Sequence, residues 1–265
     1  MKLDGCCALI TGASAGLGHE FARQLARRAR GLVLVARRGH RLNEVREELL
    51  NRDPNLIVHL RVIDLCDKSQ IGELVQWFAD NKIDIDLLIN NAGLGDYGSF
   101  ATSDPERDDR ILQVNIVALT QLTRSLLPQM IARGRGAILN VSSSAGFLPI
   151  PGMAVYAATK AYVNSFTEAL RAELRGSGIT ATALCPGPVP TEFGDAAKRP
   201  GEEPETGPGF VYVSVEQTVC DALAAVEADR PLVIPGLVMK IAMFLVRLTP
   251  MSILRRALRL RPGRS

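Results

Sequence analysis

Apolar residues in this chain gather in seven short runs, separated by longer segments of mixed polarity. Nearly every residue in a run is apolar, which is typical of strands that are covered on both faces of a sheet. The expected strands are residues 6–10, 31–36, 56–63, 85–90, 136–142, 179–185 and 230–235.

The segments between the runs repeat their apolar residues with the period of an α-helix. The expected helices are residues 18–29, 40–51, 69–81, 107–133 and 159–178. Because helices alternate with buried strands, right-handed β-α-β crossovers are expected between neighbouring strands. We therefore predict an α/β fold, a single doubly wound parallel sheet of about seven strands with helices on both faces.

The chain has 265 residues, 47% of them hydrophobic and 22% charged, which suits one large domain better than two small ones. We place this catalytic domain at residues 1–236. Within it, the charged Pro- and Gly-rich stretch 191–214 is expected to form a substrate lid. Residues 237–265 are expected to form a basic and apolar helical extension at the C-terminus.

The net charge of +3 is unevenly distributed. From Arg230 onward there are eight Lys or Arg residues and no Asp or Glu, so residues 1–229 carry a net charge of −5. The N-terminal apolar run is too short for a signal peptide, and no segment has the uninterrupted apolar length of a membrane span. We expect a cytoplasmic protein without a nucleic-acid partner.

The cysteines are odd in number and lack C-x-x-C spacing, so we expect reduced thiols in the core. The three histidines are scattered along the chain, and no metal site is expected. These residues are Cys6, Cys7, Cys66, Cys185, Cys220, His19, His40 and His59.

Three glycines follow the first expected strand in the spacing G-x-x-x-G-x-G: Gly12, Gly16 and Gly18. Glycine lets the backbone turn sharply there and lets a pyrophosphate approach the free N–H groups of a helix N-terminus. An ordinary glycine-rich turn is the alternative interpretation.

The end of the second expected strand bears on which nicotinamide cofactor is preferred. An NAD-binding chain usually has an acidic residue there, whereas this chain has Ala36 followed by Arg37 and Arg38. A guanidinium group matches a phosphate with two parallel hydrogen bonds, so these residues indicate the 2′-phosphate of NADP(H), with Ser14 adding a hydroxyl. Alternatively, both arginines are solvated residues at the start of a helix.

The stretch "VYAATKAY" places Tyr156 and Lys160 four residues apart, and so on one face of a helix. Together with "TGASAGLG", "NNAG", "SSS" and "PGPVPT", in this order and spacing, it resembles the short-chain dehydrogenase/reductase family. The resemblance extends to about Gly236 and implies a Rossmann-like, NADP-preferring oxidoreductase.

In this family, the tyrosine is the general acid or base, and the lysine lowers the tyrosine pKa and holds the nicotinamide ribose. The resemblance assigns these roles to Tyr156 and Lys160, and assigns to Ser143 the hydrogen bond that polarises the substrate oxygen. Ser142 and Ser144 are the flanking candidates for this serine. Asn115 would interrupt its helix and hold a water that relays protons toward Lys160; a packing role is the alternative for a mid-helix asparagine.

The resemblance also implies a cofactor site. Asp64 would contact the adenine amino group, Asn91 would lie near the adenosine ribose, and Val189 and Thr191 would orient the nicotinamide carboxamide. The implied cofactor-binding residues are Gly12, Ser14, Gly16, Leu17, Gly18, Arg37, Arg38, Asp64, Leu65, Asn91, Ala92, Gly93, Tyr156, Lys160, Pro186, Gly187, Val189 and Thr191.

We therefore expect an NADP(H)-dependent enzyme that interconverts a carbonyl and a secondary alcohol on a small, apolar substrate. An NADP-binding regulatory or scaffold protein, and an epimerase or dehydratase on a related sheet, are the alternatives. The residues expected at the substrate pocket are mostly apolar: Leu94, Tyr97, Phe147, Leu148, Ile150, Met153 and Phe193.

The C-terminal extension allows two interpretations. Its helices could cover the substrate pocket or build the interface of a homodimer or homotetramer. Alternatively, they could anchor the protein peripherally to the inner face of a membrane, with apolar residues in the acyl boundary and arginines at anionic head groups.

Overall fold

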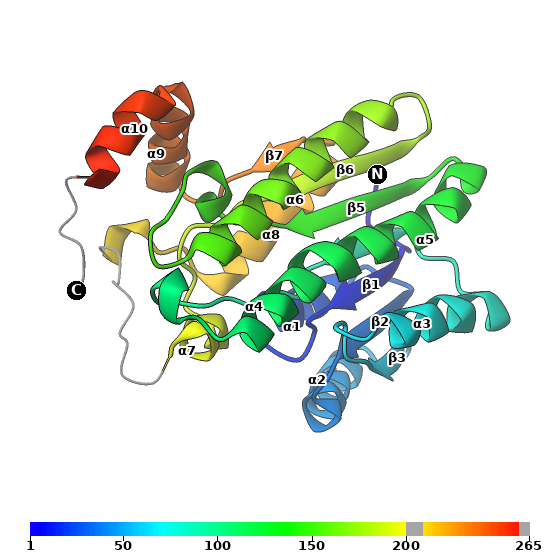
Figure 1. Cartoon of the computed structure of the whole chain (residues 1–265). Helices are drawn as coiled ribbons and strands as arrows, with labels where there is room; N and C mark the ends of the chain where they lie inside the picture. Colours follow the sequence, from blue (N-terminus) through cyan, green and yellow to red (C-terminus); the bar gives the residue numbers. More distant parts are fainter. Residues whose placement is uncertain (200–208, 260–265) are drawn as a thin grey trace.

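The computed structural model describes residues 1–199 and 209–259, and its centre is one parallel sheet (Figure 1). The strand order is β3-β2-β1-β4-β5-β6-β7, with all neighbours parallel. This confirms the predicted fold. The strands are β1 (Cys7–Thr11), β2 (Gly31–Ala36), β3 (Ile57–Val62), β4 (Leu87–Asn90), β5 (Gly136–Val141), β6 (Ile179–Leu184) and β7 (Leu232–Val233).

Helices cover both faces of the sheet (Figure 1). Helices α1, α2 and α8 pack on one face, and α3, α5 and α6 pack on the other. The bounds are α1 (Gly16–Leu25), α2 (Gly39–Arg52), α3 (Lys68–Asp80), α4 (Pro105–Leu112), α5 (Leu119–Arg133), α6 (Ala154–Glu173), α7 (Glu192–Ala197), α8 (Val215–Glu227), α9 (Leu237–Leu248) and α10 (Met251–Arg259).

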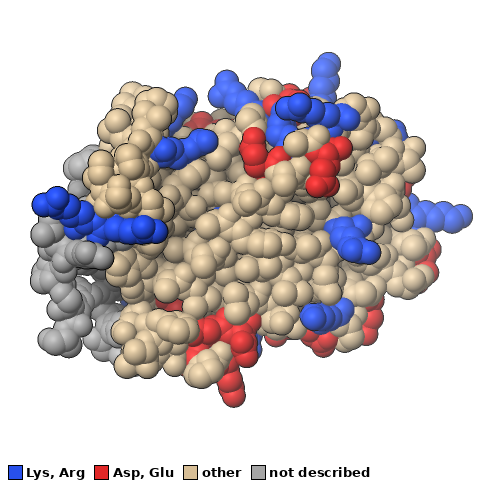
Figure 2. Space-filling model, turned by 45° about the horizontal axis from the view of Figure 1, so that its top comes forward, with Lys and Arg blue, Asp and Glu red and all other residues tan. Residues whose placement is uncertain are grey.

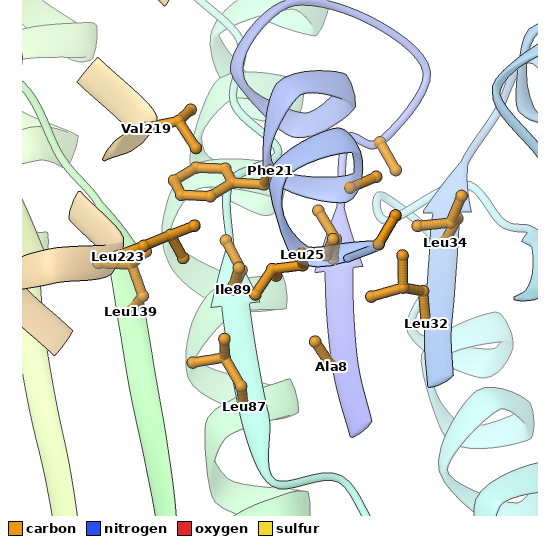
Figure 3. Close-up of a cluster of buried hydrophobic side chains, with 14 of the residues drawn as sticks. Ala8, Phe21, Leu25, Leu32, Leu34, Leu87, Ile89, Leu139, Val219 and Leu223 are labelled. Atoms are coloured by element: carbon orange, nitrogen blue, oxygen red, sulfur yellow. The ribbon is translucent and has the colours of Figure 1, made fainter. Parts of the chain in front are cut away.

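The continuous apolar strands supply both cores at once, because successive side chains point to opposite faces of a sheet. In β1, Ala8 and Ile10 enter the core beneath α1, α2 and α8, whereas Leu9 enters the core beneath α3, α5 and α6. Figure 3 shows the first of these cores, with Phe21 and Leu25 of α1 pointing toward the strands. The strand sequences are almost continuously apolar because their side chains fill the cores on both faces of the sheet.

The structure adds two α-helices to the predicted set, α8 and the short α7 within the expected lid segment. Helix α8 begins after Ser214, whose hydroxyl oxygen accepts a hydrogen bond from the backbone N–H of Gln217 at 3.1 Å. The "SVEQ" stretch has the spacing of a capping box, which was an available signal for this helix start. Two of its residues, Val219 and Val226, are fully buried against the sheet.

Two other helices differ from the prediction in their limits or regularity. Helix α6 begins at Ala154 rather than at residue 159, so Tyr156 lies inside the helix. The predicted helix 107–133 is α4 and α5 joined by a six-residue π-helical segment, Gln113–Ala118. Such π segments occur mostly as single turns inside α-helices and are frequent at functional sites.

The C-terminal extension is helical, as predicted, and α9 and α10 are separated at Thr249–Pro250. In the expected lid segment, 191–214, α7 and a short 3₁₀ turn at Gly209–Val211 are described, and residues 200–208 lie outside the described residues. None of the described helices is both long and apolar enough to cross a membrane. All five cysteines are unpaired, but Cys220 is exposed rather than in the core, because it lies on the solvent side of α8.

Candidate active site

Most of the predicted site residues lie where parallel strands end. The glycine motif follows β1, Asn91 follows β4, Ser143 follows β5 and Pro186 follows β6. The carboxyl ends of parallel strands meet at one edge of a sheet, and ligands of doubly wound folds bind outside this edge. The topology thus brings together motifs as far apart in the sequence as Gly12 and Pro186.

The glycine motif is packed too closely for side chains. A Cβ on Gly18 would lie 2.2 Å from the carbonyl oxygen of Gly12, and a Cβ on Gly12, whose φ is +67°, would lie 2.9 Å from the Cα of Ala92. Helix α1 begins at Gly16, so its first N–H groups point out of this loop. The loop fits a pyrophosphate, because free donors and the positive end of the helix face a surface without side chains.

The Asn91 side chain is hydrogen-bonded to the end of β1, where the glycine loop begins. Its side-chain amide donates a hydrogen bond to the carbonyl oxygen of Thr11 at 2.8 Å. The Thr11 hydroxyl oxygen in turn accepts hydrogen bonds from the backbone N–H groups of Asn91 and Ala92, both at 3.0 Å. The loops after β1 and β4 therefore form one rigid unit.

Tyr156 and Lys160 lie side by side in α6, both of them buried. The Lys160 Nζ atom lies 5.6 Å from the centre of the Tyr156 ring and donates a hydrogen bond to the carbonyl oxygen of Val141 at 2.8 Å. This bond ties the lysine to the end of β5, where Ser142 and Ser143 follow.

Burial controls the protonation of both residues. Removal from water raises the pKa of Tyr156 to about 12, with the Ser143 hydroxyl opposing this shift through a hydrogen bond. Removal from water also lowers the pKa of Lys160 to about 8. The lowering of the tyrosine pKa that we expected from Lys160 is not seen in this structure, because desolvation of the phenolate outweighs the hydrogen bond of Ser143.

Of the three serines, Ser143 is the one that adjoins Tyr156. Its hydroxyl oxygen accepts a hydrogen bond from the backbone N–H of Ala145 at 3.1 Å and interacts with the tyrosine. Ser142 is buried, and its hydroxyl donates to the carbonyl oxygen of Lys160 at 3.0 Å. The backbone of Ser144 donates to the carbonyl oxygen of Pro186 at 2.8 Å, which joins the ends of β5 and β6.

Asn115 lies in the π-helical segment and connects three elements. Its side-chain amide donates to the carbonyl oxygen of Leu94 at 2.9 Å and to the Thr159 hydroxyl at 3.0 Å, and its oxygen accepts from the backbone N–H of Leu94 at 2.8 Å. A Cβ on Gly93 would lie 3.5 Å from both the Asn115 oxygen and the Lys160 ammonium. The side-chain oxygen of Asn115 and the ammonium of Lys160 therefore both lie close to Gly93.

The two arginines after β2 are exposed at the same edge of the sheet. The Arg38 guanidinium donates to the Ser14 hydroxyl at 3.2 and 3.3 Å and forms an ion pair with Glu192 at 2.8 Å. Asp64 accepts a hydrogen bond from the backbone N–H of Cys66 at 3.0 Å, as a strand-end cap would. Arg38 and Ser14 together form a polar surface beside the glycine loop.

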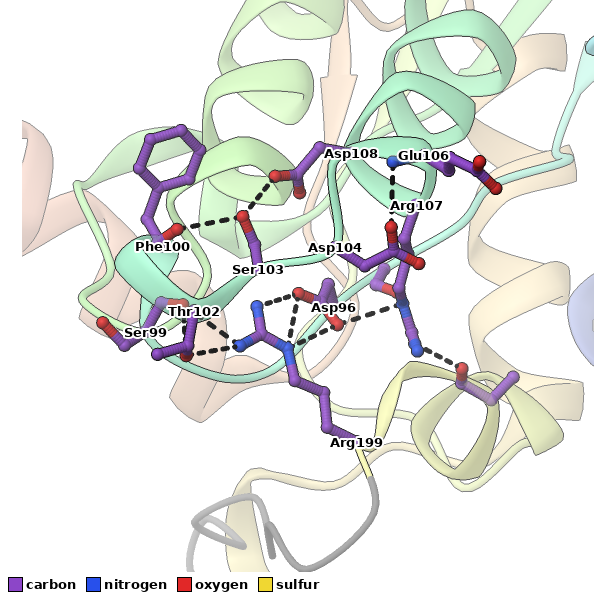
Figure 4. A network of polar contacts seen from close by, with 12 residues as sticks. Asp96, Ser99, Phe100, Thr102, Ser103, Asp104, Glu106, Arg107, Asp108 and Arg199 are labelled. Carbon is purple, nitrogen blue, oxygen red and sulfur yellow. Dashed lines mark hydrogen bonds and ion pairs between the residues drawn. The ribbon is translucent and has the colours of Figure 1, made fainter.

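A buried carboxylate that the sequence analysis did not single out holds α7 over the site (Figure 4). Asp96 forms an ion pair with Arg107 at 3.0 Å and accepts hydrogen bonds from the Arg199 guanidinium, one of them at 2.9 Å. Arg107 also donates to the carbonyl oxygen of Ala196 in α7 at 2.7 Å. No local pattern marks these residues, because they come from three separate segments.

The position of α7 determines what lies against the tyrosine. Phe193 of α7 packs on Tyr156 with ring centres 5.5 Å apart, and a Cβ on Gly95 would lie 2.7 Å from the Phe193 ring. Ile150 and Met153 pack in the same apolar cluster around Tyr156. Three of the predicted pocket residues thus surround the phenol.

Helix α9 closes the other side of the site. A Cβ on Gly187 would lie 2.7 Å from the end of the Met239 side chain, so Met239 touches the backbone after β6. The Arg247 guanidinium lies 5.7 Å from the ring centre of Phe147. Helix α9 therefore packs against the site.

A parallel sheet that ends in such a glycine loop, with a protonated tyrosine beside a lysine, defines a nicotinamide-dependent oxidoreductase acting on carbonyl or alcohol groups. The chain belongs to the short chain dehydrogenase family, whose sequence model matches residues 6–201. This confirms the resemblance drawn from the motifs.

Known proteins agree with this assignment. The chain is 38% identical over 193 residues to a sulfoacetaldehyde reductase of Chromohalobacter salexigens. The matched residues cover 71% of this chain and 74% of the relative. Among solved structures, a short-chain dehydrogenase from Sphingobium yanoikuyae in complex with NADPH has a TM-score of 0.80 at 30% identity, covering 98% of this chain and 97% of the other. A bulky-bulky ketone specific alcohol dehydrogenase from Comamonas testosteroni has a TM-score of 0.76 at 29% identity, covering 98% and 96%.

Proposed function

We propose that this chain is an NADP(H)-dependent reductase that interconverts a carbonyl and a secondary alcohol on an apolar substrate. The observation that carries the proposal is the burial of Tyr156 between Lys160, Ser143 and Phe193. The cofactor, when bound, supplies or accepts the hydride. The side chains orient the reacting carbonyl and move the proton.

Tyr156 is the proton donor in the reductive direction. With a pKa raised to about 12, its phenol is protonated at neutral pH and can transfer the proton to the carbonyl oxygen as this oxygen gains charge. Ser143, adjoining the phenol, donates a hydrogen bond to the same oxygen and stabilises the developing charge. The reverse direction requires loss of the phenolic proton and is favoured by alkaline pH.

Lys160 and Asn115 support the tyrosine. The Lys160 ammonium would hold the nicotinamide ribose hydroxyls and stabilise the phenolate left after proton transfer. Asn115 opens the helix at the π segment and holds the backbone of Leu94, and we propose that this segment carries a water-mediated proton relay to Lys160. These four residues act as one unit.

The cofactor residues are proposed from the same edge of the sheet. The loop of Gly12, Gly16, Leu17 and Gly18 would hold the pyrophosphate at the start of α1. The remaining contacts would come from Ser14, Arg37 and Arg38 at the 2′-phosphate, Asp64 and Leu65 at the adenine, Asn91, Ala92 and Gly93 at the ribose, and Pro186, Gly187, Val189 and Thr191 at the nicotinamide. The adjoining Ser14 and Arg38 side chains support NADP(H).

The apolar side chains around Tyr156 support the proposed substrate class. Phe193 and Met153 lie beside Tyr156, and Met239 covers Gly187. These side chains favour a hydrophobic ketone over a sugar. The bulky-ketone specificity of the Comamonas testosteroni neighbour supports this class, whereas the sulfoacetaldehyde relative represents a small anionic aldehyde.

The test is NADPH consumption by the purified protein with a panel of ketones and aldehydes. The panel contains aliphatic and cyclic ketones, β-keto esters, steroid ketones and sulfoacetaldehyde, each followed through the loss of NADPH absorbance. We expect the largest kcat/KM for bulky apolar ketones. Tight NADPH binding without turnover on any of these would favour a regulatory or scaffold protein instead.

Domain limits and assembly belong to the same proposal. We propose that residues 1–236 form the catalytic unit, with 191–214 as its substrate lid, and that the protein is a homodimer or homotetramer. A cytoplasmic location is proposed as well, with contact to the inner face of a membrane through residues 237–265.

A further inference from the structure

The C-terminal helices expose a concentrated apolar surface. Of the fifteen large hydrophobic side chains that are exposed among the described residues, eight lie between residues 237 and 253. These are Leu237, Val238, Ile241, Phe244, Leu245, Leu248, Met251 and Ile253. A single exposed leucine is normal on a protein surface, but a contiguous apolar patch marks an interaction site.

Helix α9 has two apolar faces, and only one of them is covered. Met243 is buried and Met239 packs on Gly187, so this face joins α9 to the active site. On the opposite face, Leu237, Ile241 and Leu248 recur at helical spacing, and Phe244 and Leu248 are 61% and 65% exposed. A surface helix normally turns polar residues toward solvent, whereas the exposed face of α9 is apolar.

The charges around the exposed face have one sign. Lys240 and Arg247 are seven residues apart, which places them together along one edge between the covered and the exposed face of α9. Arg255 and Arg256 follow in α10, and the chain has no acidic residue after Asp229. In Figure 2, basic side chains lie at this end of the molecule beside a surface of residues other than Lys, Arg, Asp and Glu.

We propose that the exposed face of α9 and the basic residues of α10 dock on an anionic lipid surface. Apolar side chains would enter the boundary between head groups and acyl chains, while Lys and Arg meet the head groups. At 12 residues, α9 is too short to span a bilayer but long enough to lie in its surface. The proposal rests on the membrane contact proposed above and specifies its surface and its lipid; it does not depend on which substrate is reduced.

Charge complementarity favours lipid over a second copy of the chain. In a two-fold contact the same patch meets itself, so Lys240, Arg247, Arg255 and Arg256 would face like charges. An anionic surface instead attracts all four, and the net charge of −5 on residues 1–229 turns the rest of the protein away from it. Docking in this orientation would place Met239 and Arg247, which touch the site, next to the lipid.

The experiment is vesicle co-sedimentation of the full-length protein. Vesicles of pure phosphatidylcholine are compared with vesicles containing phosphatidylglycerol, at low and at high salt. We expect binding to the anionic vesicles that weakens as salt rises, since exposed charges are screened within about 3 Å at 1 M salt.

Two matched pairs of variants locate the surface. Ile241→Glu should abolish binding, whereas Ile57→Glu, at a similarly exposed position on β3, should not; the two side chains are 52% and 57% exposed. Replacing Arg255 and Arg256 together by Gln should weaken binding about 25-fold, because each arginine near such a surface contributes about a factor of five. Replacing Arg124 and Arg175 by Gln should leave binding unchanged.

Circular dichroism melting shows that each variant remains folded, and light scattering reports the oligomeric state. Failure of the folded native protein to bind anionic vesicles at low salt overturns the proposal. Binding that Ile241→Glu does not reduce overturns it as well. Self-association that Ile241→Glu abolishes, without vesicle binding, would assign the face to a second copy instead.

Discussion

The Nζ atom of Lys160 lies 5.6 Å from the centre of the Tyr156 ring, and both side chains are buried. Their spacing of one helical turn places a cation next to the site where a phenolate would form. We expect Tyr156 to act through proton transfer and Lys160 through its charge, and variants of each residue test these two effects separately.

Tyr156→Phe removes the transferable proton but hardly changes volume. We expect kcat to fall roughly 10²- to 10⁴-fold, because the general acid is lost. NADPH affinity, measured by fluorescence or calorimetry, should change little. Tyr162→Phe, on the same helix and away from the site, is the control; full activity in Tyr156→Phe would move the proton-donor role to another group.

The buried lysine predicts a stability change at alkaline pH. Burial lowers the pKa of Lys160 from 10.5 to about 8. Between these values the unfolded chain binds more protons than the folded chain, so the free energy of unfolding rises with pH in this window. The pKa of Tyr156 is raised from 10 to about 12, so this residue makes the free energy of unfolding fall with pH, but only above pH 10.

Urea unfolding from pH 8 to pH 10 measures this effect. The native protein should gain about 2–3 kcal/mol relative to Lys160→Met over the interval, since each pKa unit corresponds to about 1.4 kcal/mol. Parallel pH curves for the two proteins would show that the Lys160 ammonium is well solvated in the folded state.

Arg38 should control the preference for NADPH. A bidentate guanidinium–phosphate contact is worth about 1.5–3 kcal/mol, so NADPH should bind at least about tenfold more tightly than NADH. Arg38→Ala or Arg37→Ala should remove most of this difference and leave NADH affinity nearly unchanged in calorimetry. Arg41→Ala, on the solvent side of α2, is the matched control; equal affinities in the native protein would contradict the prediction.

Two glycine-to-alanine variants should differ in what they change, cofactor affinity in one and stability in the other. Gly18→Ala places a Cβ 2.2 Å from the Gly12 carbonyl oxygen, so the loop must shift and cofactor affinity should fall at least about tenfold. Gly72, in the middle of α3, has open space around its Cα. Gly72→Ala should stabilise the protein by about 0.5–1 kcal/mol without affecting affinity, in the same thermal and calorimetric measurements.

Asp96→Asn should weaken the positioning of the substrate without changing the chemical step. The amide cannot pair with both Arg107 and Arg199, and loss of a hydrogen bond to a charged group costs about 1.5–3 kcal/mol. Helix α7 and Phe193 should then be held less firmly against Tyr156. We expect KM for bulky ketones to rise several-fold while kcat and NADPH affinity change little; an equal loss of kcat would place Asp96 in the chemical step.

Much of the fold and site followed from the sequence. Most of the strands are recognisable because both faces of the inner strands of a parallel sheet are buried, which requires continuous apolar runs. The glycine motif, the Tyr156–Lys160 spacing and the identity of Ser143 are local features, set by a turn, a helix face or a strand end. Such features depend on neighbouring residues in the chain, so a linear pattern records them.

The tertiary structure alone decided what surrounds those residues. Asp96 meets Arg107 and Arg199, and Met239 covers Gly187, across separations that no local pattern specifies. The direction of the Tyr156 pKa shift likewise depends on burial, which comes from packing against distant residues such as Phe193 of α7 rather than from the nearby lysine. Local geometry is encoded residue by residue, whereas desolvation and long-range pairing exist only once distant segments pack together.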